Sequence, residues 1–265
     1  MRRILYLLFF LIIFSSACTN KEETLLDPST DIPTSQKNIS AFNGQEKFDK
    51  AVNFLDTAEH PLAFGSLNYA NDLGVSKKVS GFGNQNGDII KLQQETAYPS
   101  GQAETISYYF GPNGMICANR HFVHFAEKTS FCMDTKSYFD KNGAVIYTCK
   151  RQSDNEEKLL QLPFTSTEKK KFSILNAMEI LNQKGKYETR LQGFMGAESK
   201  QFIIVGTKYY NSAIAYDPEN KLIKELKNRG DNALQTLLNV SFTEVKESNG
   251  FTYQGLLEIK IVPEK

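Results

Sequence analysis

Residues 107–116 read SYYFGPNGMI, and residues 136–145 read KSYFDKNGAV. Each segment has an aromatic pair, then a four-residue turn that ends in Asn-Gly, and then the start of an apolar run. Asn and Gly both tolerate the positive φ that tight hairpin turns require. The two segments therefore predict two antiparallel β-hairpins with the same turn chemistry.

Short alternating runs separated by turn residues surround these two hairpins. A further Asn-Gly pair at 86–87 predicts another hairpin. From Glu46 to about Pro61 the apolar residues follow helical spacing instead, which predicts an amphipathic helix. Residues 46–165 are therefore expected to form an antiparallel β-meander domain with an N-terminal helix. The expected strands are residues 77–82, 88–96, 104–110, 115–125, 129–139 and 144–151.

The two paired segments resemble the Tyr-rich hairpin repeats of MORN-type proteins and of some bacterial antitoxins. The resemblance covers about ten residues in each copy. It implies a sheet of repeated hairpins, and it makes an immunity or antitoxin-like role a hypothesis for this chain. The alternative is convergence, because many unrelated hairpins use the same turn residues.

Residues 166–185 are expected to form a helix that connects two domains. Thr165 and Glu168 have the spacing of a capping box, and Gly185 suits the end of the helix. An apolar stripe supports the same prediction. It consists of Phe172, Ile174, Leu175, Met178 and Leu181.

The last part of the chain, residues 186–265, has a different pattern of predicted strands and helices. Three predicted strands are followed by a short helix around Leu222, Ile223 and Leu226 and then by two more strands. This order resembles an OB-type five-stranded barrel, in which a helix lies between the third and fourth strands. The alternative is a small β-domain of another kind. The expected strands are residues 187–193, 200–207, 212–217, 237–245 and 253–262.

Together these patterns predict a mainly β protein of the α+β class. A helix-capped antiparallel β-meander is followed by a small OB-like five-stranded barrel. Both parts are expected to bury aromatic residues, because the chain has 19 Phe and 12 Tyr but no Trp.

The N-terminus predicts export. Two arginines precede the apolar run Ile4–Phe14, which is too short to span a bilayer as a helix. Ser15-Ser16-Ala17-Cys18 then resembles a bacterial lipobox of the relaxed kind found in Bacteroidota lipoproteins. The resemblance implies a signal peptide at residues 1–17, cleavage between Ala17 and Cys18, and acylation of Cys18, whereas a plain secretory signal is the alternative.

Residues 18–45 are polar and contain Pro28 and Pro33, so we expect a flexible tether. Within the tether, Lys21-Glu22-Glu23 is similar to a short signal that sends some Bacteroidota lipoproteins to the outer face of the outer membrane. A solvated charge cluster is an equal alternative. The expected location is a bacterial membrane, with the outer membrane preferred. The sequence does not decide whether the protein faces the cell surface.

The net charge of +1 argues against nucleic acid as a partner, because no global field attracts it. The barrel segment, residues 186–265, has eleven Lys or Arg against ten Asp or Glu, so no basic groove is marked there. Four tyrosines of this segment are nevertheless candidate ligand contacts. They are Tyr209, Tyr210, Tyr216 and Tyr253. For the first two, the alternative is a turn that packs on the end of the barrel.

Three cysteines lie beyond Cys18. If Phe139 faces Ala144 across the hairpin turn, Cys149 opposes Asp134, and Cys132 lies one diagonal step away on the same face. Diagonal neighbours in a sheet are about 7–8 Å apart, which exceeds the usual disulfide window. The sequence therefore leaves Cys132–Cys149 pairing and free thiols both open, with Cys117 unassigned.

Cys117, His121 and His124 have a spacing that invites a metal interpretation. In a strand, however, Cys117 and His121 share one face and His124 lies on the other, so three ligands do not converge. No metal or other cofactor is expected, and His121 is expected to be partly buried and hydrogen-bonded.

The sequence has no nucleophile elbow, no thiol-protease signature and no marked carboxylate pair, because Glu156-Glu157 sits in polar surroundings. No catalytic residue is predicted. The leading hypothesis is a non-catalytic cell-envelope lipoprotein that is held in the bilayer by Cys18 and binds an envelope protein or a glycan. The alternatives are an immunity or antitoxin-like lipoprotein and, after it, an envelope hydrolase.

Overall fold

The computed structural model describes residues 42–263, except residues 43, 59, 126–129 and 198–199. The predicted signal peptide, the cleavage point at Ala17 and Cys18, and most of the predicted tether lie outside the described residues. The described residues all belong to one compact unit of the chain. Within the part of the chain that the structure describes, no helix has both the length and the apolar character needed to cross a membrane.

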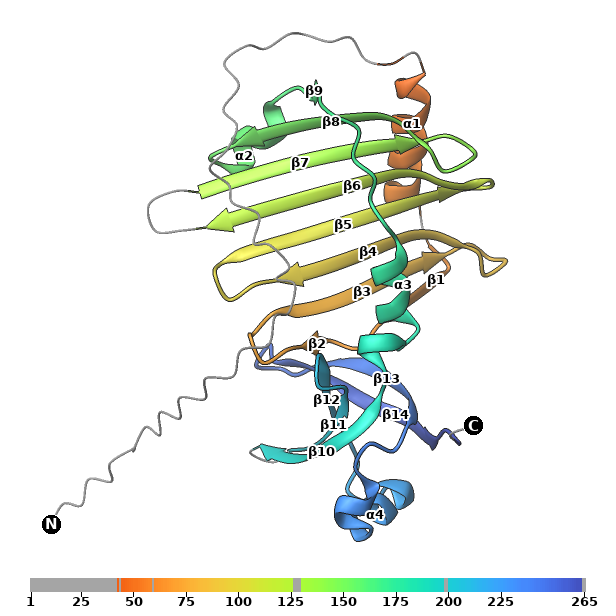
Figure 1. Ribbon diagram of the computed structural model, residues 1–265, viewed down its shortest axis with the longest axis vertical. Helices are drawn as coiled ribbons and strands as arrows, with labels where there is room; N and C mark the ends of the chain where they lie inside the picture. The colour runs from red at the N-terminus through yellow and green to blue at the C-terminus, as the bar shows by residue number, and fades with distance from the viewer. Residues whose placement is uncertain (1–41, 43, 59, 126–129, 198–199, 264–265) are drawn as a thin grey trace, which may run out of the picture. The chain divides into compact units, whose positions relative to one another are not determined.

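The predicted fold class is confirmed, since the protein is mainly β. Strands β3 to β8 pair with one another in chain order, and every pair is antiparallel, as predicted for the meander (Figure 1). The short strands β1, β2 and β9 extend its two edges. The strands are β1 Leu62–Gly65, β2 Tyr69–Ala70, β3 Ser76–Gly83, β4 Ile89–Ala97, β5 Gln102–Gly111, β6 Gly114–Phe125, β7 Ser130–Phe139, β8 Val145–Ser153 and β9 Thr165–Ser166.

The two similar segments form the hairpins β5–β6 and β7–β8, as expected from their turns. Gly114 and Gly143 have φ of 115° and 77°, a region that a side chain disfavours. In the second hairpin the carboxylate of Asp140 also accepts the backbone N–H groups of Asn142 and Ala144 at 2.8 and 2.9 Å. These local contacts fix where each strand reverses, and therefore fix the register of the hairpins.

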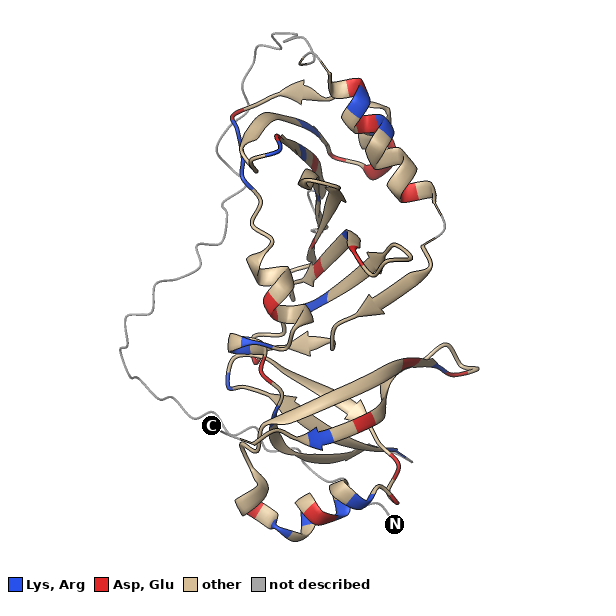
Figure 2. Ribbon diagram, turned by 90° about the vertical axis from the view of Figure 1, so that its right-hand side faces the viewer, with Lys and Arg blue, Asp and Glu red and all other residues tan. Residues whose placement is uncertain are grey.

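Adjacent tyrosines in β5 point to opposite faces of the meander sheet, as the strand period requires. The Tyr109 hydroxyl donates to Asp56 of helix α1 (Gln45–Thr57) at 3.1 Å. The Tyr108 hydroxyl donates to the carbonyl of Ser173, just before helix α3 (Leu175–Leu181), at 2.9 Å. Figure 2 shows α1 on one side of the sheet and the segment that carries α3 on the other. The sheet is thus covered on both faces.

The repeated hairpins present equivalent tyrosines to the same helix. Tyr138 occupies the position in the second hairpin that Tyr109 occupies in the first, and its hydroxyl donates to Asp49 at 2.7 Å. Asp49 and Asp56 lie seven residues apart, which places them on one face of α1 about two turns from each other. The sequence similarity between the two hairpins therefore corresponds to a shared structural contact.

The C-terminal strands pair in the order of an OB-type barrel. Strands β10, β11 and β12 form an antiparallel meander, β14 then pairs in parallel with β12, and β13 pairs antiparallel with β14. A bridge between Arg190 and Leu237, the residue before β13, closes the barrel. The five strands are β10 Arg190–Ala197, β11 Lys200–Gly206, β12 Asn211–Ala215, β13 Leu238–Lys246 and β14 Thr252–Ile261.

A helix separates the third and fourth barrel strands, as predicted. In α4 (Lys221–Asn228) the side chain of Asn220 caps the N-terminus by accepting the N–H of Ile223 at 3.1 Å. Ile223 and Leu226 are buried in the shared core, so the polar face of α4 remains outward. Two short 3₁₀ segments flank the barrel strands, η1 (Gly185–Tyr187) and η2 (Gly230–Ala233).

The meander and the barrel share one sheet and one core. Strand β2 pairs with β3 on one side and with β12 on the other. The buried side chain of Gln254 on β14 accepts the N–H of Asn68 at 2.9 Å and donates to the carbonyl of Ser66 at 3.2 Å. One cluster of buried apolar residues extends through both parts. The two regions are thus joined by backbone pairing, by buried hydrogen bonds and by apolar packing.

The connector between the two regions differs from the expectation of one helix over residues 166–185. Thr165 and Ser166 pair with β8 as strand β9, and within the expected range only α3 is α-helical. The capping-box prediction at Thr165 and Glu168 is therefore wrong, because pairing with the sheet edge satisfies the Thr165 backbone. A six-residue helix, α2 (Glu156–Gln161), was not predicted, and Asn155 caps it by accepting the N–H of Lys158.

The expected register around the cysteines is also wrong. Cys149 lies opposite Lys136 rather than Asp134, because Phe139 pairs with Val145 instead of Ala144 and the register shifts by one more residue between Tyr138 and Phe139. Cys117, Cys132 and Cys149 are all buried free thiols. The alternative of a Cys132–Cys149 disulfide is excluded by this arrangement.

Candidate functional site

An open pocket lies on the barrel beside β11, β12 and β14. Its volume is about 280 Å³. Two of the four tyrosines identified from the sequence, Tyr216 and Tyr253, line it together with Lys200 and Gln201. The parallel pairing of β12 with β14 brings these residues together, since it places the end of β12 beside the start of β14. The remaining lining residues are Ala215, Pro218, Val245, Gly255 and Leu256.

Gln201 is held in a fixed orientation at the pocket wall. The Tyr216 hydroxyl donates to its side-chain oxygen at 2.7 Å, and the Lys227 ammonium donates to the same oxygen at 2.8 Å. The side-chain oxygen of Gln201 thus accepts both hydrogen bonds, and its NH₂ group can donate to a ligand. Lys227 also lies over the rings of Phe194 and Tyr216 at 5.3 and 5.2 Å.

An aromatic platform adjoins the pocket. The rings of Phe251 and Tyr253 stack with centroids 5.9 Å apart and an interplanar angle of 29°. Phe251 is 53% exposed, and exposed apolar surface of this kind often marks a ligand site. Lys200 lies over the Tyr253 ring at 5.0 Å and pairs with Glu247 at 2.5 Å. The site therefore combines exposed ring surface with hydrogen-bond donors.

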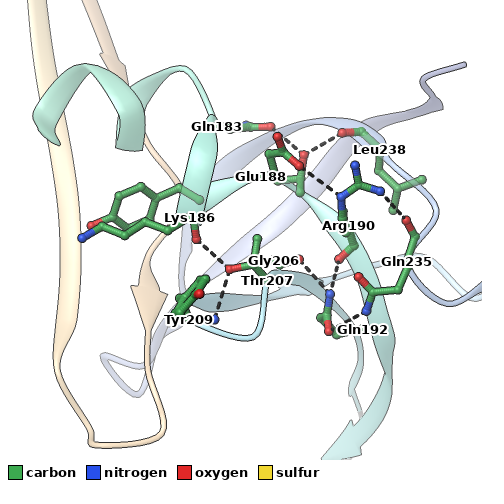
Figure 3. Close-up of polar contacts among 12 residues, drawn as sticks. Gln183, Lys186, Glu188, Arg190, Gln192, Gly206, Thr207, Tyr209, Gln235 and Leu238 are labelled. Carbon is green, nitrogen blue, oxygen red and sulfur yellow. Dashed lines mark hydrogen bonds and ion pairs between the residues drawn. The ribbon is translucent and has the colours of Figure 1, made fainter. Parts of the chain in front are cut away.

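Tyr209 and Tyr210 lie outside this pocket. Tyr210 is only 7% exposed and packs against Tyr187, with ring centroids 4.9 Å apart. Tyr209 is 57% exposed in the β11–β12 turn, where its N–H donates to the Thr207 hydroxyl at 3.1 Å (Figure 3). For Tyr210 the packing alternative is therefore the one that the structure supports.

The polar residues near Tyr209 close the barrel. Arg190 pairs with Glu188 at 3.0 Å and donates to the carbonyl of Gln235 at 3.1 Å, and Gln235 donates to Gln192 at 3.2 Å (Figure 3). Gln192 in turn donates to the carbonyl of Gly206 at 2.8 Å. These groups satisfy one another across β10, β11 and the segment before β13, so their arrangement is explained by the fold.

A second polar cluster lies on the α1 face of the meander. The Nδ1 atom of His121 is 2.7 Å from Asp134, and its Nε2 atom is 3.1 Å from Glu156 of α2. Arg151 contacts the other oxygen of Asp134 through two nitrogens, at 2.8 and 2.7 Å. His121 is half-buried and hydrogen-bonded, as predicted, whereas the contact of Glu156 with it was missed.

The protonation states in this cluster are coupled. The hydrogen bond with Asp134 raises the pKa of His121 above its ordinary value of 6.5, although burial opposes this, and Glu156 adds to the rise. Burial opposes ionisation of Asp134, but the hydrogen bonds from His121 and Arg151 outweigh it and lower the pKa of that carboxyl. The cluster therefore favours an imidazolium between two carboxylates.

The chemistry of this second cluster does not suit metal binding or nucleophilic attack. Over the described ranges, no three His, Cys, Asp or Glu side chains are arranged to hold a metal ion. Both ring nitrogens of His121 already face carboxylates. Cys132, on the same face, is fully buried, and burial raises the pKa of its thiol. The arrangement is a structural ion-pair network.

Sequence reasoning identified Tyr216 and Tyr253 but missed four residues of the pocket and its surroundings. Lys200, Gln201, Lys227 and Phe251 carry no local motif. The signal that could have indicated them is the predicted OB-like strand order, because it places the β11–β12 surface beside the β13–β14 turn. No protein-family model, curated protein or solved structure matches this chain, so its function is inferred from this geometry.

Proposed function

We propose that this chain is a lipid-anchored, non-catalytic glycan-binding protein of the bacterial cell envelope. The observation that carries the proposal is the stacked Phe251–Tyr253 pair beside the pocket lined by Lys200 and Gln201. Aromatic faces accept the apolar face of a sugar ring, and OB-type barrels use this surface for oligosaccharides or oligonucleotides. The near balance of charge in the barrel favours the sugar.

The donors at the pocket indicate what the ligand carries. The Gln201 amide keeps its NH₂ group as a donor, and the two ammonium groups nearby belong to Lys200 and Lys227. Glu247 pairs with Lys200. A glycan rich in hydroxyl or carboxylate oxygens meets these donors, whereas a ligand composed mainly of donors does not.

The non-catalytic part of the proposal is supported by the His121 cluster. Both ring nitrogens of His121 are within hydrogen-bond distance of carboxylates, so the imidazole is not poised to accept a proton from a substrate. The envelope part is supported by Ser15-Ser16-Ala17-Cys18, whose acyl chains at about 0.8 kcal/mol per buried CH₂ would hold the protein on a membrane.

Binding to an array of envelope polysaccharides tests the glycan site. The acylated protein in detergent is compared with Tyr253→Ala and Phe251→Ala variants. We expect each variant to lose at least about tenfold in affinity, or 1.4 kcal/mol, because a stacking ring is removed. Tyr209→Ala is the matched control, since it removes an exposed tyrosine that lies outside the pocket.

Two outcomes would contradict the proposal. Equal loss in the Tyr209→Ala control would show that the pocket is not the site. Capture of a stoichiometric protein from native envelope, unaffected by Tyr253→Ala and without any bound glycan, would favour the immunity or assembly role instead. The anchor is tested separately, by mass spectrometry of Cys18 in the membrane fraction and by release of the Cys18→Ala variant from it.

A further inference from the structure

Helix α2 covers the part of the meander face on which His121 lies. Leu159 of α2 is fully buried and packs with Val123 of β6 and Cys132 of β7. Arg151 of β8 donates to the backbone carbonyl of Leu160 at 3.0 Å. One leucine, one arginine and the His121–Glu156 contact thus hold a six-residue helix on the sheet.

His121 is placed between an acceptor on the sheet and an acceptor on α2. Asp134 lies 2.7 Å from Nδ1 and Glu156 lies 3.1 Å from Nε2. Ionised carboxylates only accept hydrogen bonds, and a neutral imidazole has only one N–H. Both contacts are therefore hydrogen bonds only in the imidazolium form. In the neutral form a bare nitrogen lone pair faces one of the two carboxylates.

We propose that His121 is a protonation-dependent clasp that holds helix α2 on the meander sheet and loosens the helix when the imidazole loses its proton. The contact that fails is the one to Glu156. Asp134 is nearly buried, lies closer to the ring and is held by Arg151, whereas the Glu156 side chain is half exposed. The remaining proton therefore stays on Nδ1, and Nε2 then repels the Glu156 carboxylate. This inference does not depend on the proposed glycan site.

The charges around the imidazole favour this order of events. Asp134 of β7, with Arg151 of β8 bonded to it, and Glu156 of α2 are the charged groups that face His121 among the described residues. On β5 the residue opposite His121 is the uncharged Thr105. At the start of α2, Lys158 pairs with Asp154 at 3.3 Å. The hydrogen bond with Asp134 raises the pKa of His121 above its ordinary value of 6.5.

Release of α2 is measured through Cys132, because Leu159 covers this residue. The full-length protein is labelled with a pyridyl disulfide between about pH 5.5 and pH 8.5, the range in which histidine charge changes. Peptide mass spectrometry then gives the labelling rate of each cysteine. Each Cys132 rate is divided by the rate for Glu156→Gln at the same pH, which cancels the pH dependence of the thiol reaction itself.

We expect this ratio to rise with pH by roughly two- to fivefold, the range of a partly exposed charge pair. A glutamine at position 156 can accept from Nε2–H or donate to bare Nε2, so that variant has no comparable step. NMR titration should also show a lower pKa for His121 in Glu156→Gln. Glu157→Gln is the matched control, because Glu157 shares the first turn of α2, and it should behave like the unmodified protein.

The other two cysteines report on the remainder of the molecule. Cys117 and Cys149 belong to a separate buried cluster under α1, so their labelling measures general opening. A ratio that stays constant with pH would overturn the clasp. So would a rise that Cys117 and Cys149 share equally, since it would reflect global unfolding. A step of the same size in Glu156→Gln and Glu157→Gln would overturn it as well.

Discussion

The tyrosines of the meander and the aromatic pair at the β13–β14 turn of the barrel are used in opposite ways. In the meander, the hydroxyls of Tyr108, Tyr109 and Tyr138 all donate to protein groups, and the rings are almost wholly buried. In the barrel, Phe251 and Tyr253 stack at the surface beside a pocket. The difference teaches that a tyrosine-rich sequence marks a binding surface only where the topology leaves the rings without a covering element.

The pKa values of the meander tyrosines reflect their burial. Burial, together with the nearby charge of Glu104, raises the pKa of Tyr108 to about 12. Burial and the hydrogen bond to Asp49 raise the pKa of Tyr138 further. These phenols stay protonated and act as donors that fix α1 and the α3 segment on the sheet.

Removing a buried ring from the meander should have the largest effect on stability. For Tyr138→Ala we expect a loss of about 3–5 kcal/mol in the free energy of unfolding, because a fully buried aromatic leaves a cavity. Tyr253→Ala should change this free energy by only about 0.5 kcal/mol. Urea unfolding measures both, and similar losses for the two variants would contradict the comparison.

The second largest loss of stability is expected when the hydrogen bonds of Gln254 between the two regions are removed. Gln254→Ala removes the partner of the Asn68 N–H and the Ser66 carbonyl, and each buried group left without a partner costs about 1–3 kcal/mol. Because one sheet and one core run through both regions, we expect a single unfolding transition at lower urea. Separate transitions, followed by Tyr fluorescence and by far-UV circular dichroism, would show that the two regions unfold independently.

A comparison of the two repeated hairpins should show a smaller difference. Tyr138→Phe removes the 2.7 Å bond to Asp49, whose ammonium partner Lys136 is 3.9 Å away. Tyr109→Phe leaves Asp56 paired with Lys91 at 2.7 Å. We therefore expect Tyr138→Phe to cost about 1–3 kcal/mol and Tyr109→Phe to cost less, measured by thermal unfolding. The reverse order would contradict the inference that Lys91 compensates Asp56 better than Lys136 compensates Asp49.

The smallest expected effect is a pH dependence that belongs to the meander. The folded pKa of His121 is raised, so its contribution to stability is present below pH 6.5, its unfolded value, and is lost as the pH rises through the folded pKa. The stability difference between the unmodified protein and His121→Gln should therefore shrink at alkaline pH. A difference that grows between about pH 6 and pH 9 would contradict this sign.

Local signals predicted much of the fold. The Asn-Gly pairs at 113–114 and 142–143 predicted the hairpins, and in the structure it is the glycines, Gly114 and Gly143, that supply the positive φ. Helical spacing before Pro61 predicted α1, and the order of strands and helix predicted the OB-like barrel, which the parallel β12–β14 pair confirms. These features depend on residues close in sequence or on element order alone.

The predictions for the capping box, the cysteine register and Glu156 were wrong, because each depends on contacts between residues far apart in sequence. Thr165 satisfies a capping-box pattern, yet its backbone pairs with the edge strand β8 instead of starting a helix. Cys149 lies away from its expected partner because Phe139 pairs with Val145 instead of Ala144 and the register shifts once more at Tyr138. Glu156 looked like a solvated charge, because its distance from His121 depends on how α2 folds back onto the sheet.

The sequence by itself determined the mainly β class, the hairpin positions, the strand order of the barrel and the lipobox-like motif at Cys18, because each follows from short-range chemistry. Only the tertiary structure decided which tyrosines are structural and which line a pocket. Burial depends on the elements that cover a residue, and α1 covers Tyr138 from a position 89 residues away in sequence. The pocket with Tyr216 and Tyr253 likewise exists only because β12 and β14 pair in parallel.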